Sequence, residues 1–246
     1  MFHEPRLLRS ALLFTLALEN YPAQWALAVL MRRNCMEQNA AQMLKRAAVL
    51  GYVSIMPRII ETYPVSLEEP LRLAAREGQV AAVQYLLDRG ANVDARETTR
   101  LRWAALQHAV YKGHLPVVQL LVEGGANVHA LKECALRLAA RRGDLVMIKY
   151  LIDHGANVHA QEEAALCWAA YEGHLPVVRY LVEEHKANIS ARSNLPVRAA
   201  LYSLHLDVAH YLEQQAIIVP EVVGPPNHRR QIRAILDKIE TWFNFY

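Results

Sequence analysis

Two nearly identical stretches decide the fold of this 246-residue chain. Residues 111–128 read YKGHLPVVQLLVEGGANV, and sixty residues later residues 171–189 read YEGHLPVVRYLVEEHKANI. Both belong to a longer series, because a short segment that opens with leucine recurs along the sequence. Successive copies are separated by 27, 35, 30 and 30 residues and begin at Leu44, Leu71, Leu106, Leu136 and Leu166. A period of this length predicts a solenoid of stacked repeats.

Each repeat predicts a pair of helices. In EEAALCWAAYEG, small apolar residues fall at helical spacing, and the helix dipole favours Glu162 and Glu163 in the first turn. Gly173 suits the left-handed conformation that ends a helix, and Pro176 suits the start of the next one. A further copy begins at Val197. In this copy Leu204 occupies the position where glycine is expected. A single helix pair cannot bury its own apolar face, so neighbouring pairs stack.

The second half of the repeat resembles the ankyrin-repeat family. The segments that carry the resemblance are GHLPVVQLLVEGGANVHA, GDLVMIKYLIDHGANVHA and GHLPVVRYLVEEHKANISA. The first half departs from the family, because its TPLH tetrapeptide appears here as EEPLR, ECALR and EAALC. The usual Thr–His hydrogen-bonding pair is therefore missing, and we expect looser packing of the first helices. The resemblance implies an all-α ankyrin-repeat solenoid with helical N- and C-terminal caps.

The pattern predicts three regions. Residues 1–66 form an N-terminal helical cap with degenerate repeats, residues 67–215 form the ankyrin repeats, and residues 216–246 form a linker and a C-terminal amphipathic capping helix. The apolar stripe of that last helix consists of Ile232, Ile235, Leu236, Ile239, Trp242 and Phe243. Two alternatives stay open. The last helix could instead detach to bind a partner groove, and the first residues could form an F-box-like recruitment segment.

Composition and motifs argue against several classes of function. The net charge of +3 comes from interleaved acids and bases, which disfavours nucleic-acid binding, and no apolar run is long enough to span a membrane. The three cysteines, an odd number, favour a reducing compartment such as the cytoplasm. Nucleotide-binding, hydrolase and zinc-protease motifs are absent from the sequence. We therefore predict a protein that is not an enzyme and needs no cofactor.

Histidines and cysteines are side chains of this sequence that could bind a metal ion or act as nucleophiles. His129 and His159 recur one repeat apart, but stacked helices are separated by roughly 8–10 Å. A shared zinc ion would need bonds of about 2 Å to both rings, so we predict no metal site. Cys134 and Cys167 have no evident histidine and acid partners and are expected to be small core residues.

The resemblance implies a concave groove, lined by first helices and turn tips, that binds a partner protein. The predicted partner-binding residues are Trp103, His108, Tyr111, Lys112, His129, Leu138, Arg141, Arg142, His159, Trp168, Tyr171 and Glu172. Glu133 is expected at the mouth of the groove. Aromatic residues and arginine dominate binding hot spots, and a partner with an acidic or apolar segment would complement them. Trp168 could instead pack between repeats, the tyrosines against the neighbouring helix, and the two arginines could form a solvated edge.

These observations predict a monomeric protein–protein interaction module. The regular repeats with Glu-rich openings resemble ankyrin proteins of intracellular bacteria and large viruses, which would make the chain a host-directed effector that acts in the host cytoplasm. The alternatives are an adaptor that recruits a second complex through its N-terminal segment, and an enzyme whose catalytic part lies in the non-repeat ends.

Overall fold

The chain is an all-helical stack of helix pairs. The computed structural model describes residues 36–96 and 103–215, and within these ranges it contains twelve α-helices, one short 3-10 helix and no strand. The first helices of the pairs are α3 (Met36–Leu50), α5 (Glu68–Glu77), α7 (Ala105–Lys112), α9 (Ala130–Arg142), α11 (Ala160–Tyr171) and α13 (Ala191–Tyr202). The predicted helical solenoid is confirmed. The predicted N-terminal segment before residue 36 and the C-terminal helix lie outside the described residues.

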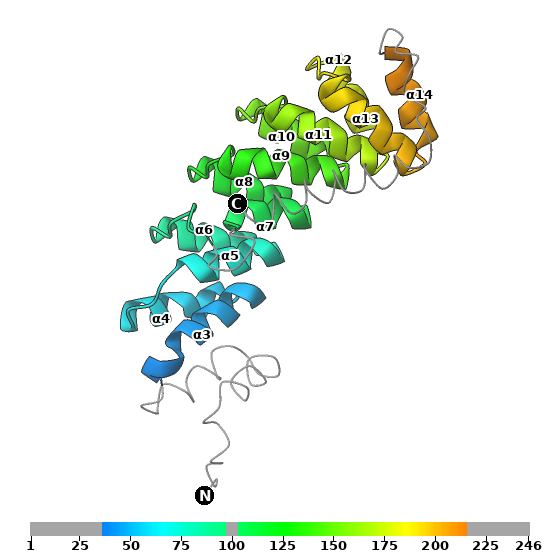
Figure 1. Cartoon of the computed structure of the whole chain (residues 1–246). Coiled ribbons are helices and arrows are strands. Elements are labelled where there is room, and N and C mark those ends of the chain that lie inside the picture. Colours follow the sequence, from blue (N-terminus) through cyan, green and yellow to red (C-terminus); the bar gives the residue numbers. More distant parts are fainter. Residues whose placement is uncertain (1–35, 97–102, 216–246) are drawn as a thin grey trace, which may run out of the picture.

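The second helices form the other row of the stack. They are α4 (Met56–Thr62), which follows the 3-10 helix η2 (Val53–Ile55), and α6 (Val80–Asp88), α8 (Leu115–Glu123), α10 (Leu145–Asp153), α12 (Leu175–Glu183) and α14 (Leu206–Gln215). The pairs follow one another in chain order along the stack (Figure 1). First helices pack against each other more extensively than second helices do, so the first-helix row forms the inner, concave side of the stack.

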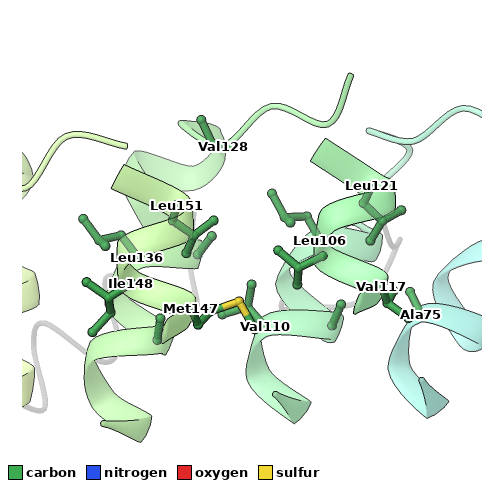
Figure 2. Packing of buried hydrophobic residues seen from close by; sticks show 14 of the residues in the cluster. Ala75, Leu106, Val110, Val117, Leu121, Val128, Leu136, Met147, Ile148 and Leu151 are labelled. Atoms are coloured by element: carbon green, nitrogen blue, oxygen red, sulfur yellow. The ribbon is translucent and has the colours of Figure 1, made fainter. Parts of the chain in front are cut away.

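A continuous apolar core runs between the pairs. The leucine that opens each repeat is buried at every copy from Leu44 to Leu166, and the alanine three residues later is fully buried in the same repeats. These alanines let neighbouring first helices approach closely, because they have no side chain beyond Cβ. Leu106, Leu136 and Met147 lie between neighbouring pairs in this core (Figure 2). Each buried leucine contributes roughly 1.5–3 kcal/mol.

A hydrogen bond from the next repeat holds the ends of α3, α5, α7 and α9. In the turn after α7, Nε2 of His114 donates to the carbonyl oxygen of Arg76 in the preceding repeat at 3.1 Å. In the turn after α11, Nε2 of His174 donates to the carbonyl of Arg141 at 3.0 Å. Because a carbonyl oxygen can only accept, Nε2 carries the proton in both histidines. We call this contact the cross-repeat staple.

The staple needs a glycine on the preceding repeat. Gly143 has φ +74°, and a Cβ atom there would lie 2.5 Å from Nδ1 of His174. Gly78 is covered in the same way by His114, at 2.8 Å. Glycine therefore serves twice at this position, since it adopts the left-handed conformation that ends the helix and leaves room for the ring of the next repeat. Gly173 confirms the predicted left-handed helix end, with φ +80°.

Other side chains make the staple where histidine is missing. Gln79, in the turn after α5, donates from its Nε2 to the carbonyl of Val49 in the first described pair at 3.0 Å. Asp144 occupies the histidine position after α9, and there Nη1 of Arg142 donates to the carbonyl of Tyr111 at 2.7 Å. Asp144 instead caps α10 by accepting from the backbone N–H of Met147. The staple is thus kept while the residue that makes it changes.

The start of three first helices differs from the prediction. Gln161, Glu162 and Glu163 have φ values of 55°, 54° and 65°, so they form a left-handed turn. The right-handed part of α11 follows that turn, and the prediction that both glutamates lie in its first turn is wrong. Equivalent left-handed turns precede the right-handed parts of α9 and α13. The physical reason is the short link, because only these residues connect the preceding turn to the helix.

The double role of glycine predicts a difference between two Gly→Ala variants. Gly125 also has a left-handed φ, +89°, but a Cβ atom there would meet nothing within 4 Å. Gly125→Ala should therefore cost about 1–2 kcal/mol from backbone strain alone. Gly143→Ala adds a clash with His174 and the loss of its bond to Arg141, so we expect at least about 1 kcal/mol more. Urea unfolding of both variants tests this expectation, and equal losses would contradict the staple.

Candidate functional site on the first-helix face

The N-terminal half of the predicted groove contains a compact aromatic cluster. Trp103 lies just before α7, and its ring centroid is 5.4 Å from those of His108 and Tyr111. Nζ of Lys112 lies 5.8 Å from the ring centroid of Tyr111. Trp103 and His108 are half-buried, whereas Tyr111 is 45% exposed. The structure therefore brings these four predicted residues together, with Tyr111 as the outermost ring.

A second cluster spans the next repeats. The guanidinium carbon of Arg141 lies 4.9 Å from the ring centroid of Trp168, and its Nε donates to Oε1 of Glu172 at 3.2 Å. The ring of Trp168 meets Tyr171 edge-on at 6.0 Å. These four predicted residues therefore also form one network, in which the Arg141 side chain is held by a ring and by a carboxylate.

The burial of Trp168 changes what it can do. It is only 5% exposed, so its ring supports Arg141 and Tyr171 from below and presents little surface of its own. The alternative considered from the sequence, packing between repeats, describes its position. Leu138, also expected in the groove, is half-buried against the core.

Tyr202 also belongs to this cluster, although it was not among the residues predicted from the sequence. Its ring stacks on that of Tyr171, with 6.2 Å between centroids and 14° between planes. Tyr202 occupies the position in α13 that Tyr111 and Tyr171 occupy in α7 and α11. Extending the same position to the last repeat would have found it.

Arg142 and Arg141 have different environments although they are adjacent. Arg141 lies within the second aromatic network, whereas Arg142 turns back over Gly113 and makes the cross-repeat staple to Tyr111. The structure thus gives Arg142 a bond within the stack, and its role in partner binding stays a prediction.

Comparison with known proteins identifies the family. A family model described as Ankyrin repeats (3 copies) matches residues 44–132, 106–193 and 136–217, which together make up more than half of the chain. The chain belongs to the ankyrin-repeat family. Ankyrin repeats are generally protein–protein interaction modules and are typically non-catalytic. No curated protein matches the chain.

The turn tips of these ankyrin repeats hold an unusual pair. Nδ1 of His129 lies 2.6 Å from Oε1 of Glu133, and Nδ1 of His159 lies 2.7 Å from Oε1 of Glu163. The histidines are largely exposed, whereas both glutamates are buried at the left-handed turns. The carboxylate of Glu133, a residue expected at the mouth of the groove, is buried and holds the turn to the histidine before it.

Arg137 supports the first of the left-handed turns. This buried side chain donates to the carbonyl oxygens of Lys132 and Leu131, the latter at 3.2 Å. Burial lowers the pKa of Arg137 to about 10, so the guanidinium stays charged at neutral pH. Donation from a charged group to two carbonyls offsets part of the cost of three left-handed residues.

The two described cysteines are buried. Burial raises the pKa of Cys134, and it raises the pKa of Cys167 to about 12. A thiol in this state is a poor nucleophile, because the reactive form is the thiolate. Both cysteines pack as the sequence predicted, and the environment of neither one activates it. Cys35 lies outside the described residues.

Two other kinds of site are absent from the part of the chain that the structure describes. Within residues 36–96 and 103–215, no three His, Cys, Asp or Glu side chains come together in a way that could hold a metal ion. In the same part of the chain, no helix is both long and apolar enough to cross a membrane.

The His–Glu pair predicts a specific loss of stability. His159→Ala removes the only bond made by the Glu163 carboxylate within the described structure, and leaving a buried polar group unsatisfied costs about 1–3 kcal/mol. Ser190 is the equivalent residue of the next ankyrin repeat, where asparagine replaces the glutamate. We therefore expect Ser190→Ala to cost less than about 0.5 kcal/mol in the same urea titration. Equal effects would show that the pair contributes nothing.

Cysteine burial predicts slow alkylation. At pH 8 a thiol with a pKa of about 12 is ionised to roughly one part in ten thousand. Peptides that contain Cys134 and Cys167 should stay unmodified by iodoacetamide in the folded protein and react fully in urea, as measured by mass spectrometry. Rapid modification of Cys167 in the folded state would contradict its placement in the core.

Proposed function

We propose that the first-helix face of this ankyrin-repeat protein binds a partner protein, with Tyr111 and Lys112 at the centre of the contact. One observation carries the proposal. The same position near the end of five successive first helices holds only arginine or tyrosine: Arg76, Tyr111, Arg141, Tyr171 and Tyr202. Large side chains of these types, lined up on the concave side, favour a protein ligand.

The charges along this line indicate what the partner offers. Arg76 is paired with Glu77, and Arg141 is paired with Glu172. Lys112 lies instead over the ring of Tyr111, where its exposed ammonium group can meet a carboxylate. The proposed ligand is therefore a segment that places an apolar side chain against Tyr111 and an acidic one beside Lys112.

Arg141 and Trp168 contribute to the proposed site by holding it rigid. The Arg141 side chain is fixed between the Trp168 ring and the Glu172 carboxylate, so little side-chain entropy remains to be lost on binding. Tyr171 is fixed in the same way by Trp168 and Tyr202. Pre-ordered side chains favour binding without rearrangement of the stack.

The wider setting is also a proposal. A monomeric module in the cytoplasm, or in a host cytoplasm if the chain is an effector, agrees with an interaction function. Recruitment of a second complex by an F-box-like N-terminal segment concerns residues before Met36, which lie outside the described structure.

The test compares two surface variants against a captured partner. A partner taken from native lysate is purified, and its affinity is measured for wild type, for Tyr111→Ala/Lys112→Glu and for Val146→Ala. We expect the double variant to lose at least about tenfold in affinity, since a hot-spot residue contributes roughly 2 kcal/mol. Val146 is 62% exposed on α10, outside the first-helix face, and its variant should bind within about twofold of wild type.

Circular dichroism checks that the variants remain folded. Unchanged affinity of the folded double variant would move the interface away from Tyr111 and overturn the proposed site.

A further inference from the structure

The last described repeat breaks the glycine rule. Leu204 occupies the position that holds Gly78, Gly113, Gly143 and Gly173 in the preceding repeats. It still adopts the left-handed conformation, with φ 63°, and its side chain is 69% exposed. A leucine here is strained and largely in water, so the position costs stability unless something covers the side chain.

Leu204 also disfavours a further repeat stacked here in the way that the interior repeats are stacked. In the interior of the stack, the next repeat places His174 where a Cβ atom on Gly143 would lie, and Arg142 does the same at Gly113. A leucine side chain fills that space. The cover of this end is therefore a different kind of element from the repeats that precede it.

The neighbouring residue shows the same exposure. Leu115, Leu145 and Leu175 begin second helices and are half-buried, whereas the equivalent Leu206 is 64% exposed. Leu204 and Leu206 together form an apolar surface between α13 and α14, which we call the terminal shoulder.

We infer that the terminal shoulder docks residues 232–243 of the same chain. This segment carries an apolar stripe at helical spacing that includes Ile235, Ile239 and Trp242, with Arg233 and Lys238 off the stripe. Its apolar side complements the two leucines of the shoulder. Residues 216–231 separate α14 from the segment, and sixteen residues can span up to roughly 50 Å, which is ample to turn back onto the shoulder.

The inference is independent of partner binding at Tyr111. It assigns the end of the stack to the chain itself and so leaves the arginine and tyrosine line, which ends at Tyr202, as the surface for a partner. A second copy of the chain is the competing occupant of the shoulder, and the experiment separates the two.

Hydrogen exchange of the full-length protein tests the docking. Peptides covering residues 232–243 are followed in wild type, in Leu204→Gly/Leu206→Ser and in the control Val146→Ser, which alters an exposed apolar residue of an interior repeat. We expect slow exchange in wild type and control, and exchange at least about tenfold faster in the double variant. Exchange in wild type should not depend on protein concentration.

Two exchange results overturn the inference. One is equal exchange of residues 232–243 in all three proteins. The other is protection that appears only at high protein concentration together with a dimer in light scattering, because the shoulder would then be covered by a second copy.

A second measurement uses the strain at Leu204. Leu204→Gly relieves the strained backbone but also removes the apolar contact with residues 232–243. In an Ile235→Asp/Ile239→Asp background docking is blocked, so only the relief of strain remains. The substitution should therefore raise the thermal midpoint more in that background than in wild type. The same shift of the thermal midpoint in both backgrounds overturns the inference. This result can be interpreted even if the Leu204→Gly/Leu206→Ser variant used for hydrogen exchange is less stable than wild type.

Discussion

The architecture depends on one recurring contact, the hydrogen bond from one repeat to the last turn of the preceding first helix, which is made at the ends of α3, α5, α7 and α9. His114, Arg142 and His174 each donate to a carbonyl that the helix end would otherwise leave unsatisfied, while covering a glycine. The contact ties helix termination to stacking, because the same glycine permits both. Helix pairs joined in this way cannot slide along one another without exposing the carbonyls.

The staple also positions the candidate site. Its acceptors include the carbonyls of Arg76, Tyr111 and Arg141, and these are the residues whose side chains form the line on the concave side. In each of these residues the backbone carbonyl joins the neighbouring repeats, and the side chain contributes to the candidate binding surface. Arg141 and Arg142 divide the two tasks, since the first stacks on Trp168 and the second makes the staple.

The short turns between repeats explain the buried charges. Three consecutive left-handed residues are costly for L-amino acids. Glu133 and Glu163 bind the histidines before them, and Arg137 binds the carbonyls of the first turn. The buried polar groups of the repeats are therefore structural, and they stand where the family's Thr–His pair is missing.

The sequence by itself determined the repeat, its helix pairs, the buried leucines and the glycine helix ends, because periodicity and glycine conformation are local properties. It also indicated the Tyr111 cluster, since repeat position places residues on a face. Only the tertiary structure decided that Trp168 is buried, that Arg142 bonds to Tyr111 and that Glu163 lies in a left-handed turn. The burial of Trp168 and the bond of Arg142 depend on contacts with the neighbouring repeat, and the left-handed turn depends on the length of the segment between two repeats. The spacing of these residues in the sequence does not reveal either kind of constraint.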